Sequence, residues 1–234
     1  SWDTGPTLGE VLRALPAPPS DAAAVQSAAQ QLHTRTRGHT AGVAAAHRCA
    51  PLAMAPWWAA GAEGEAALAE AARAESLTSH AHRISQETCV AVALLCRLLA
   101  AEPAPVSPDR RAAVVRRVAE ACQGAPEVAN ALLQGLSCRQ TAITNRGFCP
   151  EVLQAAVFFV RDAASFGDAL VASIRFAGPA NYCPVLVGAL AGALFGPEDI
   201  DSSLLAHCAP ELLEAIQAAT DALVAPAQGR EKEA

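Results

Sequence analysis

The chain has 234 residues, of which 52% are hydrophobic and 17% are charged, and its formal net charge at pH 7 is −6. A chain of this length and apolar content can bury one sizeable core, which excludes disorder over most of its length. The acidic balance offers no basic field to a phosphate backbone and excludes nucleic acid as an expected partner.

The pattern along the chain predicts helices and no strands. Helical periodicity or capping residues mark, in chain order, the segments 21–33, 62–77, 83–102, 107–122, 126–136, 150–163, 165–175, 183–195 and 209–224. Asp21 stands at an N-cap position, and Ser107 precedes a proline, Pro108, at the first helical position of its segment. No stretch alternates apolar and polar residues as a half-buried strand does. The sequence therefore predicts an all-α fold.

The apolar runs are too short to cross a bilayer. The longest, 89–101 and 183–195, have about a dozen residues, whereas a membrane helix needs roughly 20. We therefore expect no membrane span. The second run is rich in glycine and alanine, which predicts a central, buried helix that neighbouring backbones approach closely. On that interpretation, Gly192→Leu would overpack the core.

Residues 1–225 are predicted to form a single domain, with a proline-rich connector at 15–21. The last residues, 226–234, are polar and charged and are expected to form a flexible tail. The chain shows no internal repeat at a fixed period, so nothing indicates an array of smaller units.

The cysteines are scattered, without a C-x-x-C pair or a short cluster with histidine. This spacing is typical of reduced, small core residues. It favours a reducing intracellular compartment, either the cytoplasm or an organelle reached after processing. The eight positions are Cys49, Cys89, Cys96, Cys122, Cys138, Cys149, Cys183 and Cys208.

His80, His82 and Arg83 lie in one short turn before the helix predicted at 83–102. They could form a pocket for a transition metal or for an anionic ligand. The alternative is a helix start that Thr78 or Ser79 caps, with both histidines in solvent.

A second basic segment, 33–39, contains two arginines and two histidines. It could meet a phosphate group. The alternative is a connector in solvent that binds nothing.

Trp57 and Trp58 are adjacent and follow a proline. Tryptophan is favoured at interface hot spots, so the pair could be an exposed anchor for a protein partner. The alternative places Trp57 in the core and leaves Trp58 half covered.

Four stretches together resemble the ADP-ribosylglycohydrolase family. They are 3–15, 44–54, 76–95 and 147–196, and they span nearly the whole chain. The last is the most specific: a glycine-aromatic turn and a helix are followed by a helix starting Ser-Phe and by a loop that leads into GALAGA. The resemblance implies an all-α, multi-helix orthogonal bundle of the ADP-ribosylglycohydrolase type.

The loop before GALAGA departs from the family pattern. In members that hydrolyse ADP-ribosyl bonds it reads G-G-D-x-D-T, and its aspartates and threonine help to hold two magnesium ions. Proline, asparagine and tyrosine stand there instead, and none is a strong ligand for a hard divalent ion. The resemblance therefore implies a vestigial ligand loop with no metal and no cofactor, made of Gly178, Pro179, Asn181, Tyr182 and Cys183.

The thiol of Cys183 is a candidate nucleophile if a base lies near it; the alternative is a buried structural cysteine. The family's other metal motif, T-D-D-T, normally lies upstream of the part that resembles 3–15, and only two residues precede Asp3. The chain therefore resembles an N-terminally shortened member.

Arg48 belongs to an R-x-A-P string that survives from the family pattern. The polar turn before it is replaced by Ala41, Val43 and Ala44. Arg48 could line a ligand pocket, or it could satisfy carbonyls beside a helix start.

Three functions follow from the resemblance and its departures. The first is a catalytically degenerate domain that acts as a binding or structural subunit with a protein partner, in which a small-molecule ligand could still bind. The second is a hydrolase of ADP-ribosyl or related glycosidic bonds whose missing metal motif comes from another chain. The third is a metal-independent enzyme that uses the old pocket. The missing ligands favour the first and predict no hydrolase activity.

Overall fold

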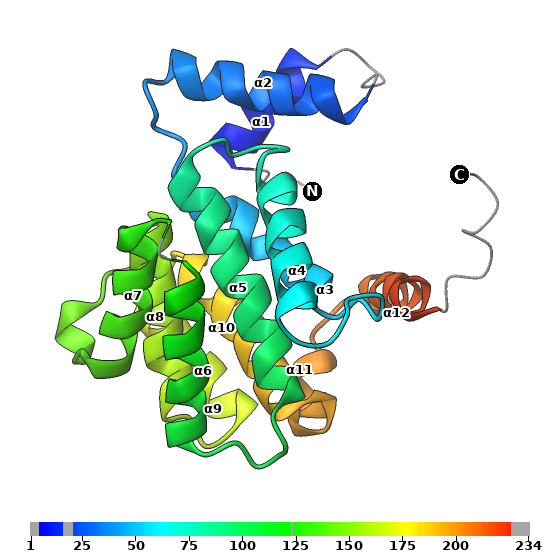
Figure 1. The fold of residues 1–234 in the computed structure, drawn as a ribbon. Helices are drawn as coiled ribbons and strands as arrows, with labels where there is room; N and C mark the ends of the chain where they lie inside the picture. The colour runs from blue at the N-terminus through cyan, green and yellow to red at the C-terminus, as the bar shows by residue number, and fades with distance from the viewer. Residues whose placement is uncertain (1–4, 16–20, 123, 226–234) are drawn as a thin grey trace.

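The computed structural model of the chain describes residues 5–15, 21–122 and 124–225. Over these residues the protein is all-α, as predicted, and its only bridge between extended segments joins Gly42 and Phe148. Figure 1 shows the helices, which in chain order are α1 (Pro6–Ala14), α2 (Ala22–Arg35), α3 (Ala46–Ala53), α4 (Ala62–Ser76), α5 (Arg83–Ala101), α6 (Pro108–Ala121), α7 (Pro126–Ser137), α8 (Cys149–Arg161), α9 (Phe166–Ala177), α10 (Tyr182–Phe195), α11 (Ser202–Leu205) and α12 (Pro210–Val224). Three short 3-10 helices, at Val43–Ala45, Gln140–Ala142 and Pro197–Asp199, complete the described part.

The helix boundaries follow from local sequence signals. Asp21 caps α2 by accepting a hydrogen bond from the Ala24 amide at 2.7 Å. Ser107 caps α6 in the same way, and Pro108 is its first residue. All nine predicted helices are observed, while the short helices α1, α3 and α11 were not predicted.

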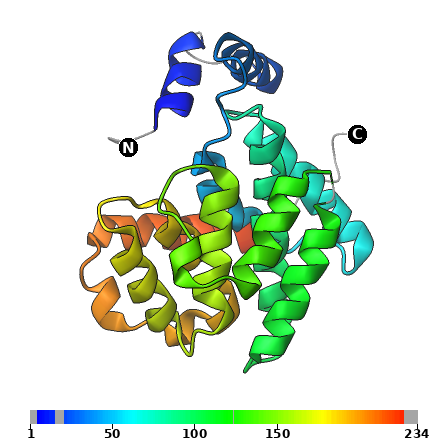
Figure 2. The same cartoon turned by 90° about the vertical axis from the view of Figure 1, so that its left-hand side faces the viewer.

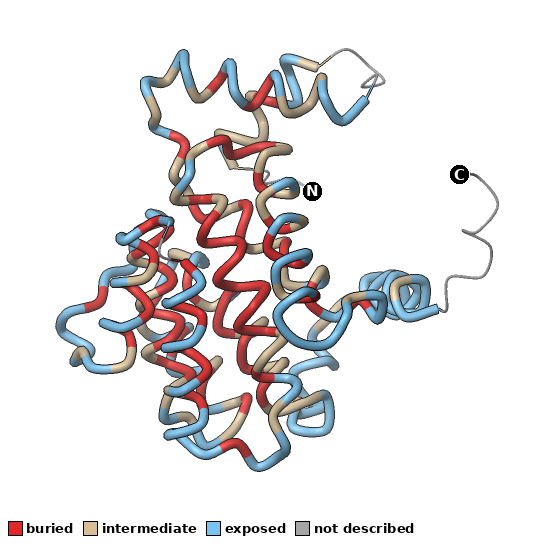
Figure 3. The backbone as a smooth tube through the Cα atoms, viewed as in Figure 1, coloured by how far each residue is buried: buried red, intermediate tan, exposed pale blue. Residues whose placement is uncertain are grey.

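Helix α5 is the centre of the bundle. It contacts α3, α4, α6, α8 and α10, and most of its length is buried, as Figure 3 shows. Among the described helices it alone is long and apolar enough to cross a membrane by length and composition, but 67% of its most apolar window is buried inside the protein. This burial is typical of a core helix.

A buried arginine joins α6 to the end of α8. Arg111 is 8% exposed, and its guanidinium donates to the carbonyls of Val106, Val160 and Ala163 at 2.9, 3.2 and 2.7 Å. Carbonyls at the end of a helix have no partner within the helix. Arg111 therefore satisfies acceptors that would otherwise be buried without a hydrogen bond.

Helix α10 packs against α5, α8 and α9, as expected of a central helix, but only one of its faces is buried. Leu186 and Leu190 lie in the core, whereas Gly188 and Gly192 are half-buried on the opposite face. A Cβ atom added at either glycine would meet no atom within 4 Å. The close approach of neighbouring backbones that was expected at these glycines is therefore not observed, and the effect of Gly192→Leu stays a prediction.

The first two helices form a hairpin with a small core of its own, which contains Val11, Ala28, Ala29 and Leu32. The main hydrophobic cluster contains no residue of this hairpin. Figures 1 and 2 both show the hairpin at one end of the bundle, with α2 crossing above the start of α5. The single domain expected over 1–225 stays a prediction.

Helix α12 lies at the other margin and has no buried residue. Its apolar residues Leu212 and Ile216 are 52% and 54% exposed. The tail expected at 226–234 and most of the connector at 15–21 lie outside the described residues.

Candidate functional site

A cavity of about 610 Å³ lies where three helix starts meet. Its wall comes from the first residues of α1, from the segment between Gly42 and Arg48, and from Asn181 and Tyr182 at the start of α10, with His80 and Gly147 between them. None of the N-caps Gly5, Gly42 and Asn181 provides a side-chain hydrogen bond to the helix that follows it. The positive ends of the helix dipoles of α1 and α10 favour an anion at such a place.

His47 makes a direct contact with the vestigial loop. Its Nε2 donates to the backbone carbonyl of Tyr182 at 2.9 Å, because a carbonyl can only accept. The Nδ1 atom of the neutral ring is therefore an acceptor. Burial lowers the pKa of His47, the hydrogen bond to Tyr182 opposes this shift, and the charge of Arg48 adds to it. His47 is thus predominantly neutral at pH 7.

His80 lies deeper in the same wall and is 1% exposed. Its Nδ1 is hydrogen-bonded to the Ser79 hydroxyl at 2.8 Å. Burial, with smaller contributions from Arg48 and His47, lowers the pKa of His80 to about 4. The expectation that this histidine is solvated is therefore wrong, and its imidazole is neutral at physiological pH.

Arg48 is held by α4 and the turn after it. Its guanidinium is paired with Glu75 and donates to the hydroxyls of Thr78 and Ser79. Arg48 thus lines the cavity, and its partners are a carboxylate and two hydroxyls instead of the carbonyls that one alternative expected. The second carboxylate oxygen of Glu75 is buried without a hydrogen bond. Burial raises the pKa of Glu75, and the charge of Arg48 opposes this shift.

The vestigial loop contributes little to the cavity. Gly178 ends α9 with a positive φ of 58° and, like Pro179, is exposed away from the wall. Only Asn181 and Tyr182 line the cavity. Burial raises the pKa of the Cys183 thiol to about 12, so Cys183 is a structural core cysteine and is not a nucleophile at neutral pH.

The donor set of this wall does not fit a pair of magnesium ions. Among the described residues, no carboxylate lines the cavity, and no three histidine, cysteine, aspartate or glutamate side chains stand close enough to hold a metal ion. Magnesium prefers carboxylate and water oxygens in octahedral array. Asn181 and Tyr182 offer only neutral oxygens.

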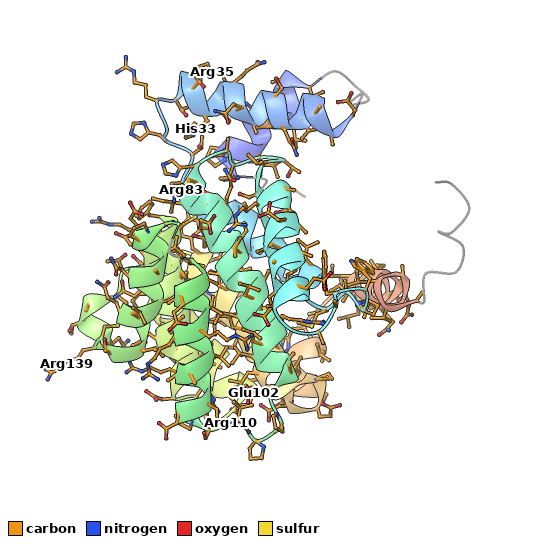
Figure 4. The ribbon with its side chains drawn as sticks, in the orientation of Figure 1. His33, Arg35, Arg83, Glu102, Arg110 and Arg139 are labelled. Carbon is orange, nitrogen blue, oxygen red and sulfur yellow. The ribbon has the colours of Figure 1, made fainter. Side chains whose placement is uncertain are left out.

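His82 and Arg83 lie outside the cavity, whereas His80 lines it, so the pocket expected from these three residues is divided. His82 caps α5, because its Nδ1 accepts the Ile84 amide at 3.0 Å. Thr78 and Ser79, the predicted caps, do not cap this helix. The ring of His82 lies edge-on to that of His33, with 5.4 Å between the ring centroids. Arg83, the residue after His82, is exposed, and Figure 4 labels it at the start of α5.

The two tryptophans differ in their environment. Trp58 is half-buried, and its indole Nε1 donates to the Leu52 carbonyl at 2.6 Å. Arg97 holds the same loop through the carbonyls of Ala53 and Trp58, both at 3.3 Å. Trp57 is 54% exposed, so its assignment to the core is wrong. A held loop therefore presents one tryptophan to solvent.

Sequence reasoning missed His47 as a site residue, although it lies in the stretch 44–54. Its neighbour Arg48 carried the recognisable motif, and only the fold brings the His47 side chain to the carbonyl of Tyr182. A histidine within an alanine-rich segment was the one available signal.

The comparisons with known proteins agree with this fold. The sequence matches the family model for ADP-ribosylglycohydrolase over residues 2–233. The chain is also similar to a solved structure described as an "ADP-ribosylglycohydrolase-related protein complex", with a TM-score of 0.64 and 23% identity over 85% of this chain and 67% of that one. No curated protein matches the sequence. The predicted bundle type is therefore confirmed.

Proposed function

The chain belongs to the ADP-ribosylglycohydrolase family, and we propose that it is a catalytically degenerate member that acts as a binding or structural subunit with a protein partner. The observation that carries this proposal is the chemistry of the cavity wall. The loop that holds magnesium in hydrolysing members gives the wall only Asn181 and Tyr182, and no described carboxylate replaces the missing ligands.

The family's reaction depends on what that loop normally supplies. Metal ions orient the ribose, polarise the bond that breaks and position the attacking water. An asparagine amide cannot act as a general base. Without carboxylates the wall can hold a ligand, but it lacks the groups that would assemble the water and the ions around it.

The same wall retains features that favour a small anionic ligand. Asn181 provides no side-chain cap at the start of α10, and the Arg48 guanidinium is the only charged side chain among the described lining residues of the cavity. Backbone amides at helix starts donate to anions without needing a metal. Binding without turnover is thus consistent with the residues present.

The exposed tryptophan supports the protein partner. Trp57 lies in the loop that Arg97 holds, close in sequence to Met54, which is 40% exposed. A large aromatic side chain on a preorganised loop loses little conformational entropy when it is buried against a partner. Trp57 is therefore our candidate anchor, and Trp58 is the residue that supports it from within.

A second candidate function is a metal-independent enzyme that uses the cavity. The observation in its favour is the pair of neutral imidazoles, His47 and His80, whose pKa values are both lowered. The unprotonated Nδ1 of His47 could accept a proton from a bound substrate. The missing feature is a second group that would stabilise developing charge.

An activity assay separates these functions. The chain is incubated with peptides that carry ADP-ribose on arginine or on serine, with magnesium or with chelator, and free ADP-ribose is measured by mass spectrometry. We expect no release in either condition. Release that chelator abolishes would overturn the proposal.

Release that survives chelator would overturn it in favour of the second candidate, provided that His47→Gln abolishes the activity. His39→Gln is the matched control, because His39 is an exposed histidine outside the cavity wall.

A further inference from the structure

The α1–α2 hairpin forms the roof of the cavity. Gly5, Pro6, Thr7 and Leu8, at the start of α1, line it opposite the residues of α3 and α10. The hairpin has its own hydrophobic core and contributes no residue to the main core. Movement of the hairpin would therefore uncover the cavity without breaking the packing of either hydrophobic cluster.

The segment that joins α2 to the body passes through Arg37 and Gly38, and we call it the hinge. Arg37 and Gly38 have φ values of 54° and 87°, and Arg37 is the only described residue other than glycine with a positive φ. Non-glycine residues in this left-handed region are strained. Beyond the hinge the chain is fixed to the body, because the Ser85 hydroxyl donates to the Thr40 carbonyl at 3.1 Å.

The hairpin meets the body through a pair of histidines at this hinge. His33, in the last turn of α2, is hydrogen-bonded through Nδ1 to the Thr40 hydroxyl at 2.6 Å. Its ring lies edge-on to the ring of His82, the N-cap of α5, at an interplanar angle of 77°. Figure 4 shows His33 and Arg83 on the two sides of the junction between hairpin and body.

Protonation of His82 would weaken this contact for two reasons. Its Nδ1 accepts the Ile84 amide, and a protonated Nδ1 can no longer accept. The neighbouring His33 also disfavours the charged form of His82.

The charged groups around the pair act in both directions. Arg83 on α5 carries the same charge as a protonated histidine, while Glu127 on α7 opposes it. Burial and then His33 lower the pKa of His82, and Glu127 partly offsets the shift. Because a lowered pKa in the closed state favours the neutral ring, the contact is stable above the ordinary pKa of about 6.5 and weakens as the pH falls below it.

We propose that the α1–α2 hairpin is an acid-released lid, which the contact between His33 and His82 holds closed over the cavity at neutral pH and which turns about Arg37 and Gly38 when His82 is protonated. The inference goes beyond the proposed function, because it holds whichever ligand the cavity takes. It also holds whether or not that ligand is turned over.

Hydrogen exchange of the full chain, read by mass spectrometry and corrected for the intrinsic rate, tests the lid. At about pH 5.5 the amides of 22–35 should lose roughly tenfold in protection relative to about pH 7.5, since release is coupled to proton uptake. The amides in the middle of α5 should keep theirs. Equal protection of the hairpin at the two pH values, or a parallel loss in α5, would overturn the proposal.

Two variants and a control make the test specific to the histidine pair. His33→Gln keeps a hydrogen-bonding group beside Thr40, and His82→Asn keeps an acceptor at the N-cap, so both can fold while neither gains a charge. Each should reduce the acid response, and the double variant should abolish it. His39→Gln removes an exposed histidine from the same segment and should leave the response intact. A double variant that still responds, or a His39→Gln variant that does not, would contradict the assignment.

Discussion

The α7–α8 interface and the outer face of α10 both carry glycines within apolar helices, yet only the first is closely packed. A Cβ atom at Gly135 on α7 would lie 2.7 Å from the Val157 side chain and 2.8 Å from the Gln154 carbonyl oxygen. At Gly192 on α10 the same atom would meet nothing within 4 Å. A glycine in an apolar helix therefore does not by itself indicate close packing. Whether a side chain would fit there depends on the element packed against the helix.

Polar residues show the same contrast between the interior of the bundle and its surface, which we call the rim. Arg110 and Arg111 are adjacent in α6, but Arg110 pairs with Glu102 at the surface, whereas Arg111 is buried among carbonyls. Figure 4 shows Arg110 and Glu102 at the lower margin of the bundle. Four predictions test how far the contrast between interior and rim extends.

The largest effect is expected at Arg111. Arg111→Met should lower the free energy of unfolding by about 4 kcal/mol, because several buried carbonyls lose their donor at once and each costs about 1–3 kcal/mol when unpaired. Arg110→Met, at the exposed neighbour, should cost at most about 1 kcal/mol. Urea unfolding of the two variants measures both values. Equal losses would show that burial does not distinguish the two arginines.

The next effect depends on pH and concerns His80. Its pKa is lowered to about 4, so the folded state favours the neutral ring. The resulting stability is complete above the unfolded-state pKa of about 6.5 and is lost as the pH falls from there towards 4, by about 3 kcal/mol in all.

The measurement for His80 is the difference in unfolding free energy between the chain and its His80→Gln variant, taken at several pH values in that window. Other titrating groups cancel in this difference. A difference that does not change with pH would mean that the protein interior does not disfavour the charged ring.

A smaller effect is expected at the two glycines. Gly135→Ala should destabilise the protein by about 2 kcal/mol, because neither the Gln154 carbonyl nor the Val157 side chain can move away without disturbing α8. Gly192→Ala should instead stabilise it by up to about 1 kcal/mol through helix propensity. Thermal unfolding of both variants gives the sign of each change. Destabilisation by Gly192→Ala would indicate that something covers the outer face of α10.

No effect is expected from magnesium. A ligand that binds the folded state raises the thermal midpoint by mass action, so midpoints with and without millimolar magnesium should coincide if the cavity holds none. Differential scanning fluorimetry in the presence of chelator supplies the baseline. A clear upward shift would mean that ligands outside the described wall complete a metal site.

The helices themselves were predictable from the sequence. Their periodicity and caps are local, so Asp21 and Ser107 mark helix starts whatever surrounds them. The order of motifs also predicted the fold type, while the loss of metal ligands at Pro179, Asn181 and Tyr182 stays a prediction.

The tertiary structure decided which of these residues meet. His80 and His82 are two apart in the chain, yet one enters the cavity wall and the other turns towards His33, because the turn before α5 directs them to different sides. His47 became a site residue only when α3 was placed beside the start of α10. The open face of α10 could not be predicted from its sequence either, because a glycine does not indicate whether another helix packs against it. Burial and contact between distant segments depend on how the helices assemble, and local periodicity does not specify that assembly.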